Sequence, residues 1–160
     1  MLSAPGQVPL LAETTPSGNY LVEMKMQINL PTSGDGIDYA QGGVMIYGDD
    51  QSYLKLHVFA NSNTRQVEFF KQISNSLAGQ GNYGSIPLGP PGDSTWLRIA
   101  KRTLSGQEQY AAYSSQDGIN WVRGGTWNAS LGASTRIALF AQSRSGFLVD
   151  FDYIHVSTLP

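Results

Sequence analysis

Side chains that could bind a ligand alternate with apolar side chains along two neighbouring segments, 53–60 and 65–73. Residues two apart in a strand share a face, so if Leu54, Leu56 and Val58 point into a core, the residues between them point outward. In this interpretation the outward set is Tyr53, Lys55, His57, Phe59, Glu68, Phe70 and Gln72, and the same parity adds Arg98 and Tyr113. Aromatic rings stack on the C–H face of a sugar while amides and charges bind its hydroxyls, so the set predicts a sugar-binding sheet face. Two alternatives stay open: a long loop or a partner domain covers these aromatic residues, or they form a structural surface only.

Trp127 is the best placed of the three tryptophans for an exposed stacking platform, because it follows Gly124 and Gly125 in an expected loop. Packing against the rest of the protein is nevertheless the favoured interpretation for this residue. Trp96 and Trp121 are expected to pack at the corners of sheets.

Acidic residues gather in two expected turns, at Asp35 and Asp38 and at Asp49 and Asp50. Carboxylates and backbone carbonyls in turns can bind a structural calcium ion. The favoured interpretation is that these aspartates bond to the backbone of their own turns. A structural calcium site is kept as the alternative, and no other cofactor is expected.

Nucleophilic catalysis is disfavoured, because the chain has only His57 and His155 and no Gly-x-Ser-x-Gly elbow. A second catalytic set would combine His57 with Lys55, Arg98 and Tyr113, which supply the residue types that alginate-lyase-like jelly rolls need. None of the sequence motifs of that group is present, so the sequence does not favour a lyase.

Period-2 alternation between turn residues predicts a chain made almost wholly of strands. The expected strands are Tyr20–Leu30, Gly42–Gly48, Tyr53–Ala60, Arg65–Ile73, Thr95–Thr103, Gln107–Ser115, Ile119–Gly124, Thr135–Gln142 and Gly146–Ser157. The Gly- and Pro-rich stretch Ser74–Ser94 is expected to be a long surface loop with a short strand at Tyr83–Leu88. Two stacked antiparallel sheets bury so many one-sided strands, with a closed barrel as the competing architecture.

Composition narrows the class of protein. The 160 residues include no Cys, only 14% charged residues and a net charge of −2, which excludes disulfide scaffolds and Cys-ligated metals and disfavours nucleic-acid partners. No apolar stretch is long enough to span a membrane, and residues 1–6 do not resemble a signal peptide. We therefore expect either a cytosolic protein or a module taken from a longer exported chain, folded as one domain over residues 1–160.

Four motifs occur in a familiar order: GVMIYGDD with YLKL at 43–56, TWLRI at 95–99, YSSQDGINW at 113–121 and VDFDYIHV at 149–156. Together they resemble concanavalin A-like, laminin G-like jelly-roll modules found at the ends of family-43 β-xylosidases and related extracellular glycoside hydrolases. The resemblance covers about residues 19 to 157.

The resemblance implies a sandwich with one concave sheet, on which lectin-like relatives bind sugars on the face or at its rim. In the β-xylosidases such a module packs against the catalytic domain. Concanavalin A-like glucanases place their acids in a Glu-x-Asp-x-x-Glu run, and no such run exists here. Asp150 and Asp152 share a strand face, but their motif implies structural hydrogen bonds rather than catalysis.

These observations predict an all-β, two-sheet antiparallel jelly-roll sandwich that acts as a non-catalytic carbohydrate-binding or accessory module of an extracellular glycoside hydrolase. The expected partners are a neutral poly- or oligosaccharide and a fused catalytic domain, with no nucleic acid and no membrane. The alternatives are a structural docking module that binds no free sugar and a glycosidase or lyase of the same fold. The candidate ligand-binding residues are Tyr53, Lys55, His57, Glu68, Phe70, Gln72, Arg98, Tyr113 and Trp127.

Overall fold

The computed structural model describes residues 10–30, 39–62, 64–74, 82–142 and 147–160, and these segments form eleven strands. None of the described segments is a helix long and apolar enough to cross a membrane. The strands are β1 (Leu10–Thr14), β2 (Tyr20–Ile28), β3 (Gln41–Asp49), β4 (Ser52–Asn61), β5 (Thr64–Ile73), β6 (Tyr83–Gly89), β7 (Thr95–Leu104), β8 (Gln107–Ser115), β9 (Val122–Asn128), β10 (Arg136–Gln142) and β11 (Val149–Thr158).

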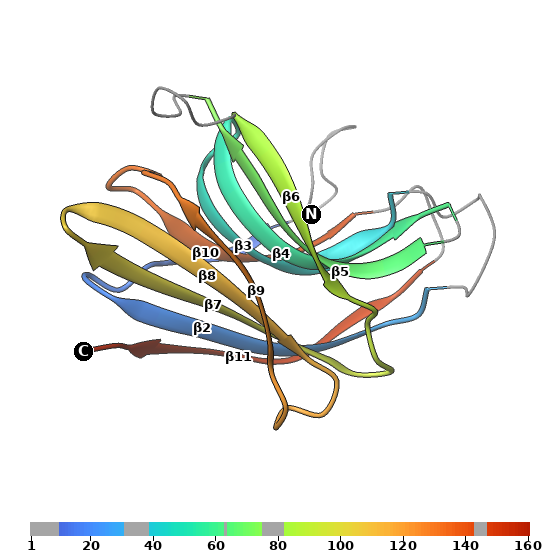
Figure 1. Ribbon diagram of the computed structural model, residues 1–160. Helices are drawn as coiled ribbons and strands as arrows, with labels where there is room; N and C mark the ends of the chain where they lie inside the picture. The colour runs from blue at the N-terminus through green and yellow to red at the C-terminus, as the bar shows by residue number, and fades with distance from the viewer. Residues whose placement is uncertain (1–9, 31–38, 63, 75–81, 143–146) are drawn as a thin grey trace.

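The strands form two sheets that stack face to face (Figure 1). One sheet has six strands in the order β1-β10-β3-β4-β5-β6, and the other has five in the order β11-β2-β7-β8-β9. All neighbouring strands pair antiparallel. The six-stranded sheet is strongly curved, and its concave surface faces away from the other sheet (Figure 1). The predicted all-β jelly-roll sandwich is therefore confirmed, and the closed barrel is wrong.

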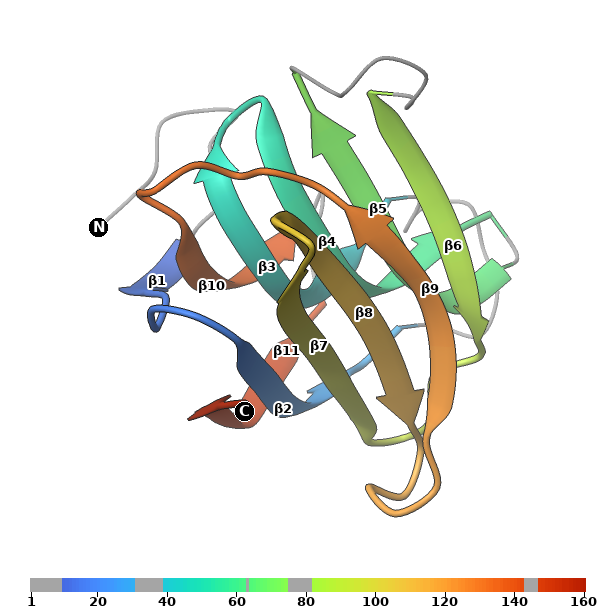
Figure 2. The same cartoon turned by 60° about the vertical axis from the view of Figure 1, so that its left-hand side comes forward.

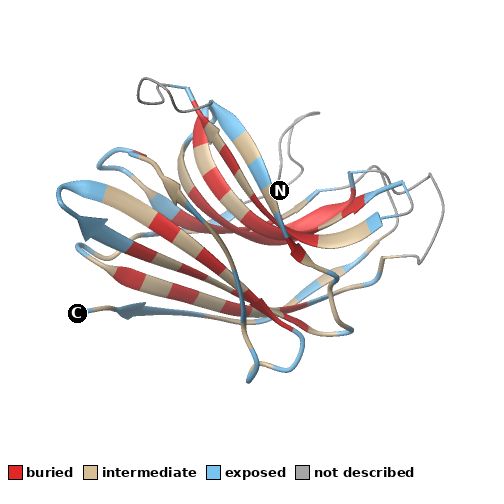
Figure 3. Ribbon diagram, in the orientation of Figure 1, coloured by how far each residue is buried: buried red, intermediate tan, exposed pale blue. Residues whose placement is uncertain are grey.

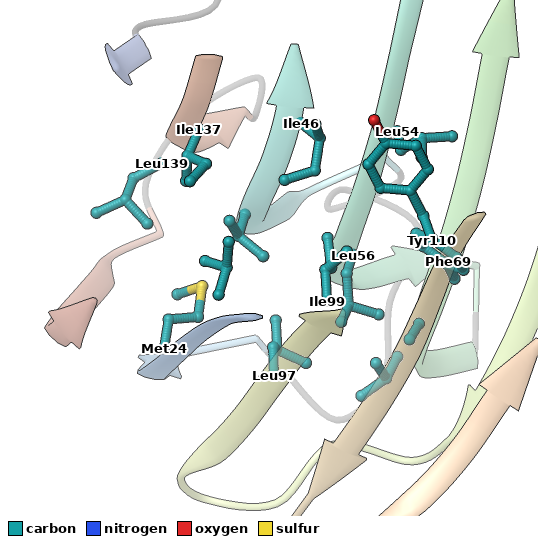
Figure 4. Packing of buried hydrophobic residues seen from close by; sticks show 14 of the residues in the cluster. Met24, Ile46, Leu54, Leu56, Phe69, Leu97, Ile99, Tyr110, Ile137 and Leu139 are labelled. Atoms are coloured by element: carbon teal, nitrogen blue, oxygen red, sulfur yellow. The ribbon is translucent and has the colours of Figure 1, made fainter. Parts of the chain in front are cut away.

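Buried apolar residues from both sheets form one core between them (Figure 4). On β2, β4 and β7 the burial alternates residue by residue, visible as coloured bands along the strands in Figure 3. Met24, Leu56, Phe69 and Leu97 are fully buried in this core. Burying each such side chain stabilises the fold by about 1.5–3 kcal/mol. The alternation therefore favours a strand and determines which of its faces lies in the core.

The stretch 74–94 contains more regular structure than its composition indicates. β6 pairs with β5 from Gln72↔Tyr83 to Val67↔Gly89, so it is a full member of the sheet. Glycine and proline weaken strands, but an edge strand tolerates them because half of its backbone groups need no partner. Position 84 needs a glycine for a specific reason, because a Cβ atom there would lie 2.8 Å from Cη2 of Trp127.

Two strands differ from the sequence-based expectation. β1 was not expected, and it pairs with β10 at the edge of the six-stranded sheet. β9 begins at Val122 rather than at Ile119, because the Asp117 carboxylate accepts the backbone N–H groups of Ile119 and Asn120 and holds them in the turn. Asp117 and Gly118 thus lie in the connection between β8 and β9, which is longer than a two-residue hairpin loop.

Candidate functional site

A row of ring-bearing and polar side chains crosses the concave face of the six-stranded sheet. Strand register places Arg136, Tyr47, Tyr53, Gln72 and Tyr83 opposite one another on β10, β3, β4, β5 and β6. Their neighbours in sequence, such as Ile46 and Leu54, are fully buried between the sheets, so this row points out of the core. At about 4.8 Å between strands the row spans roughly 19 Å. We call these five residues the tyrosine row.

Hydrogen bonds and ring contacts fix the orientation of the tyrosine row. The Tyr53 hydroxyl donates to Oε1 of Gln72 at 2.9 Å, and the Tyr47 hydroxyl donates to Oδ1 of Asp50 at 2.6 Å. The Arg136 guanidinium lies 5.2 Å from the centre of the Tyr47 ring. The bond to Asp50 raises the pKa of Tyr47, and burial raises the pKa of Tyr53, so both phenols stay protonated at neutral pH. The Tyr47 and Tyr53 rings are thus held in place with fixed polar edges.

Lys55 and Phe70 lie in the next row of the concave face, where they pair directly. The Lys55 ammonium lies 4.8 Å from the centre of the Phe70 ring and donates to Oε1 of Gln41 at 2.6 Å. Burial lowers the pKa of Lys55 to about 8, although the nearby Glu68 carboxylate opposes this. Phe70 is half-buried and its ring centre lies 6.1 Å from that of Tyr53, so the two rings form one aromatic patch.

His57 and Glu68 face the concave side but form its floor. His57 is only 1% exposed and contacts the rings of Phe59 and Phe140. Neither of its ring nitrogens has a hydrogen-bond partner among the described residues, and burial followed by the charge of Lys55 holds its pKa well below the usual value. Glu68, at 7% exposure, accepts a hydrogen bond from the Ser85 hydroxyl.

Arg98 and Tyr113 do not belong to the concave face, so this part of the sequence-based prediction is wrong. They pair with each other on β7 and β8 of the five-stranded sheet. Arg98 forms an ion pair with Glu23 at 2.5 Å, and its guanidinium carbon lies 3.6 Å from the centre of the Trp121 ring. Parity identified both as outward-facing, but alternation carries no information on which sheet a strand joins. The lyase-like combination of these two residues with Lys55 and His57 is therefore not assembled.

Trp127 lies in β9, not in a loop, and the favoured expectation that it packs inside is confirmed. Its indole N–H donates to the carbonyl of Phe69 at 3.3 Å, and the two ring centres are 6.3 Å apart. The Lys71 ammonium lies 4.8 Å from the indole. The glycines before Trp127 are strand residues that make room for β6: a Cβ on Gly125 would collide with the side chain of Ile86.

The acidic turn residues that the structure describes accept hydrogen bonds from nearby groups. Asp35 and Asp38 lie outside the described residues. Asp49 accepts the backbone N–H of Gln51 at 2.8 Å, and Asp50 accepts the tyrosine hydroxyl mentioned above. The described segments hold no group of three or more His, Asp or Glu side chains that could bind a metal ion. Structural calcium stays an untested expectation.

Asp150 and Asp152 belong to β11 at the edge of the five-stranded sheet. Asp150 lies opposite Gln27, and Asp152 lies where the register shifts by one residue. The Asp152 carboxylate forms an ion pair with Lys25 at 2.7 Å. At least one of the two carboxylates thus has a partner that stabilises strand pairing, in line with the structural role expected from the motif.

Three members of the tyrosine row escaped the sequence analysis: Tyr47, Tyr83 and Arg136. The signal for Tyr83 was present, because Tyr83, Ser85 and Pro87 alternate with smaller or apolar residues that face the core. Tyr47 and Arg136 were visible as strand residues, but only the pairing of β3 with β10 brings them together.

No protein-family model matches the chain, and no curated protein sequence matches it significantly. Solved structures do. The GH43 protein BlXynB from Bacillus licheniformis is similar over 88% of this chain, with 16% identity and a TM-score of 0.67. A bifunctional GH43-CE protein from Bacteroides eggerthii is similar over 94%, with 14% identity and a TM-score of 0.71. A legume lectin-like domain from Entamoeba histolytica is similar over 97%, with 9% identity and a TM-score of 0.56.

The share of the matched protein that this chain spans differs between the GH43 proteins and the lectin-like domain. This chain spans 28% of the Bacillus licheniformis protein and 19% of the Bacteroides eggerthii protein, but 81% of the lectin-like domain. The chain thus has a jelly-roll sandwich fold like that of one part of these GH43 chains and of the lectin-like domain, which confirms the resemblance of the four motifs at the level of the fold. A shared fold alone does not carry an activity from one protein to another.

Proposed function

We propose that this protein is a non-catalytic carbohydrate-binding module whose ligand lies along the tyrosine row. The observation that carries the proposal is that three tyrosines, a glutamine and an arginine from five different strands form one line on a concave surface. Such a line suits an extended oligosaccharide, because successive sugar rings can each meet an aromatic ring and a hydrogen-bonding group.

The chemistry of the patch favours a neutral glycan. Aromatic faces at Tyr53 and Phe70 offer apolar contact, while Gln72 and the lysine beside them offer hydrogen bonds. The Lys55 ammonium lies near the Glu68 carboxylate, and the Asp50 carboxylate lies beside the Tyr47 ring that Arg136 contacts, so the patch carries charges of both signs. We expect binding to change little with ionic strength, because no exposed ion pair to the ligand is required.

The proposed contact residues differ from those expected from the sequence. Tyr53, Lys55, Phe70 and Gln72 keep a direct role, and the other three members of the tyrosine row join them. His57 and Glu68 are assigned to the floor that supports these side chains. Arg98, Tyr113 and Trp127 are assigned no contact with a glycan on this face.

The role of an accessory module in an exported glycoside hydrolase is part of the proposal. It is supported by the short share of the GH43 chains that this fold occupies, 28% in one and 19% in another. In that setting the module would hold a polysaccharide near a catalytic domain and work outside the cell. The competing role, docking without free sugar binding, predicts no affinity for glycans in the isolated chain.

Affinity gel electrophoresis against a panel of neutral polysaccharides tests the proposal. We expect the protein to be retarded by at least one of them, and Tyr53→Ala and Phe70→Ala each to weaken the retardation about tenfold, the size of a typical binding hot spot. Tyr113→Ala is the matched control, because this tyrosine lies on the other sheet. Unchanged mobility with every polysaccharide contradicts the proposal and favours docking.

A further inference from the structure

A cavity separate from the tyrosine row lies at one end of the sandwich, between the two sheets. Its volume is about 230 Å³. It is built where the end of β6 and the end of β8 meet, together with the β6–β7 and β8–β9 connections, which lie at the same end of the molecule (Figure 2). The tyrosine row, in contrast, lies on the outer face of one sheet. The cavity therefore belongs to no site described so far.

The two connections around the cavity are fastened to each other. The Gln116 side-chain N–H donates to the carbonyl of Pro90 at 2.9 Å, which joins the β8–β9 turn to the β6–β7 connection. Gly92 lies against this bond, and a Cβ atom there would lie 3.2 Å from Cβ of Gln116 and 2.7 Å from the carbonyl oxygen of Ser94. The walls are thus held by specific contacts and leave the cavity open.

One wall of the cavity is apolar. Val67 and Leu88 form its inner part and are almost completely buried, while Pro90 and Val122 extend it outward. Val122 is 55% exposed, although it begins a strand whose other side is packed. Aliphatic side chains in this arrangement offer a flat apolar surface without an aromatic ring.

The opposite wall carries hydroxyl and amide groups. Thr95, Ser114 and Ser115 are buried there, and Gln116 and Asn120 lie at the exposed side. The Thr95 hydroxyl bonds to the backbone of Gly92, and the Ser115 hydroxyl donates to Asp117. Ser114 is left as the lining hydroxyl without a hydrogen bond to another described residue. A buried hydroxyl can both donate and accept, which suits a ligand that does the same.

Asp117 is the one charged residue of this lining, and its carboxylate is held in place by its own turn. It accepts hydrogen bonds from the Ser115 hydroxyl at 2.9 Å, from the backbone of Ile119 at 2.8 Å, and from the backbone and side chain of Asn120, both at 2.7 Å. Oδ1 accepts three of these bonds and Oδ2 accepts one, so Oδ2 keeps a lone pair. These bonds, led by the Asn120 side chain, hold the pKa of Asp117 well below its usual value, so the carboxylate stays ionised at neutral pH. Its remaining lone pair suits a ligand that donates an O–H group.

We infer that this cavity binds a single neutral sugar ring. The volume is below the 300–1,000 Å³ of sites for drug-sized ligands, which limits the occupant to about one ring. An apolar wall facing a hydroxyl wall matches a pyranose, which has a C–H face and a hydroxyl edge. The choice of a sugar over other neutral cyclic polyols rests on the proposed function. The cavity itself is separate from the tyrosine row.

Titration of the isotope-labelled chain with methyl β-D-xylopyranoside, methyl β-D-glucopyranoside and mannitol, followed by amide NMR spectra, tests the inference. We expect at least one glycoside to shift the amide signals of residues 114–120, while mannitol, an acyclic polyol, leaves them in place. No shift of these signals with either glycoside overturns the inference, and an equal response to mannitol overturns the preference for a ring.

Variants separate the cavity from the concave face. Val122→Trp should fill the mouth and abolish the shifts, and Ser114→Ala, which removes the hydroxyl without adding bulk, should weaken binding about tenfold. Val156→Trp is the matched control, since Val156 is also an exposed strand valine, at 38%, but lies on β11. Tyr53→Ala should leave the glycoside shifts intact. Failure of polysaccharide retardation with intact glycoside shifts refutes the proposed concave site alone, and the reverse result refutes the cavity alone.

Discussion

At the residue scale, two side chains show how the local environment decides the chemistry of a titratable group. Lys55 is half-buried against Phe70, and its ammonium is held by Gln41. Asp117 is exposed but accepts four hydrogen bonds inside its own turn. Burial disfavours the charged form of the lysine, whereas hydrogen bonding favours the charged form of the aspartate, so the two groups respond to pH in different ranges.

The pKa of Lys55 predicts how stability changes at alkaline pH. The folded-state pKa is about 8, below the ordinary value near 10.4, so between these values the unfolded chain binds one more proton than the folded chain. The free energy of unfolding should therefore rise across this range, by up to about 3 kcal/mol from this residue. Urea unfolding at several pH values should show the rise in the wild type and a smaller one in Lys55→Met. Identical pH profiles for the two proteins contradict the prediction.

The pKa of Asp117 predicts how stability changes at acidic pH. Because the folded-state pKa is depressed, the contribution of Asp117 to stability is present above the unfolded pKa near 3.9 and is lost as the pH falls below it. Asp117→Ala should lower the melting temperature at pH 7, and the gap to the wild type should narrow under acidic conditions. Thermal unfolding followed by circular dichroism measures both effects. A gap that stays constant down to low pH would show that the turn does not need the charge.

At the element scale, β6 and β9 are adapted to each other across the edge of the sandwich. Glycines on one strand face large side chains on the other: Gly84 faces Trp127, and Gly125 faces Ile86. The Trp127 indole also bonds to the backbone of Phe69 on the next strand. These contacts close the β6–β9 edge of the sandwich without hydrogen-bonded pairing between the sheets, which explains why glycines persist inside two strands.

Gly84→Ala should destabilise the fold by about 1–3 kcal/mol, because the new methyl group would overlap the Trp127 ring in a well-packed region. Trp127→Phe removes the overlapping carbon atom, so the same glycine substitution should cost less in that background. A double-mutant cycle by urea denaturation measures this coupling. Additive effects of the two substitutions would mean that the ring and the glycine do not constrain each other.

At the scale of the whole molecule, the two faces of the six-stranded sheet differ in burial, and only the inner face belongs to the core between the sheets. Phe69 and Phe70 are neighbours in the sequence, yet Phe69 is fully buried in the core and Phe70 is half-buried on the concave face. The core joins both sheets, so residues on the inner face hold the molecule together. The contacts that we propose with a glycan are assigned to residues on the concave face.

This separation predicts contrasting effects for two adjacent substitutions. Phe69→Ala should lower the free energy of unfolding by about 3–5 kcal/mol, the usual cost of removing a buried phenylalanine. Phe70→Ala should cost clearly less stability but should weaken polysaccharide retardation. Urea denaturation and affinity electrophoresis of both variants provide the comparison. Equal losses of stability would contradict the assignment of the two faces.

Much of the fold was accessible from local sequence signals. Alternation is a property of single strands, so it correctly identified the buried faces of β2, β4, β5 and β7 and the outward position of Tyr53, Phe70 and Gln72. The regular structure of the glycine- and proline-rich β6 was underestimated. Its low strand propensity is overridden because it pairs with β5 and packs on β9.

The sequence by itself determined that the chain forms one-sided strands and which side chains leave the core, because the two-residue period is fixed by the backbone of each strand. Only the tertiary structure decided which of the outward residues meet. Arg98 and Tyr113 lie on one sheet and Tyr53 and Phe70 on the other, while Arg136 joins Tyr47 across 88 intervening positions. Strand pairing is set by contacts between distant segments, so a pattern read along one strand cannot reveal its neighbours.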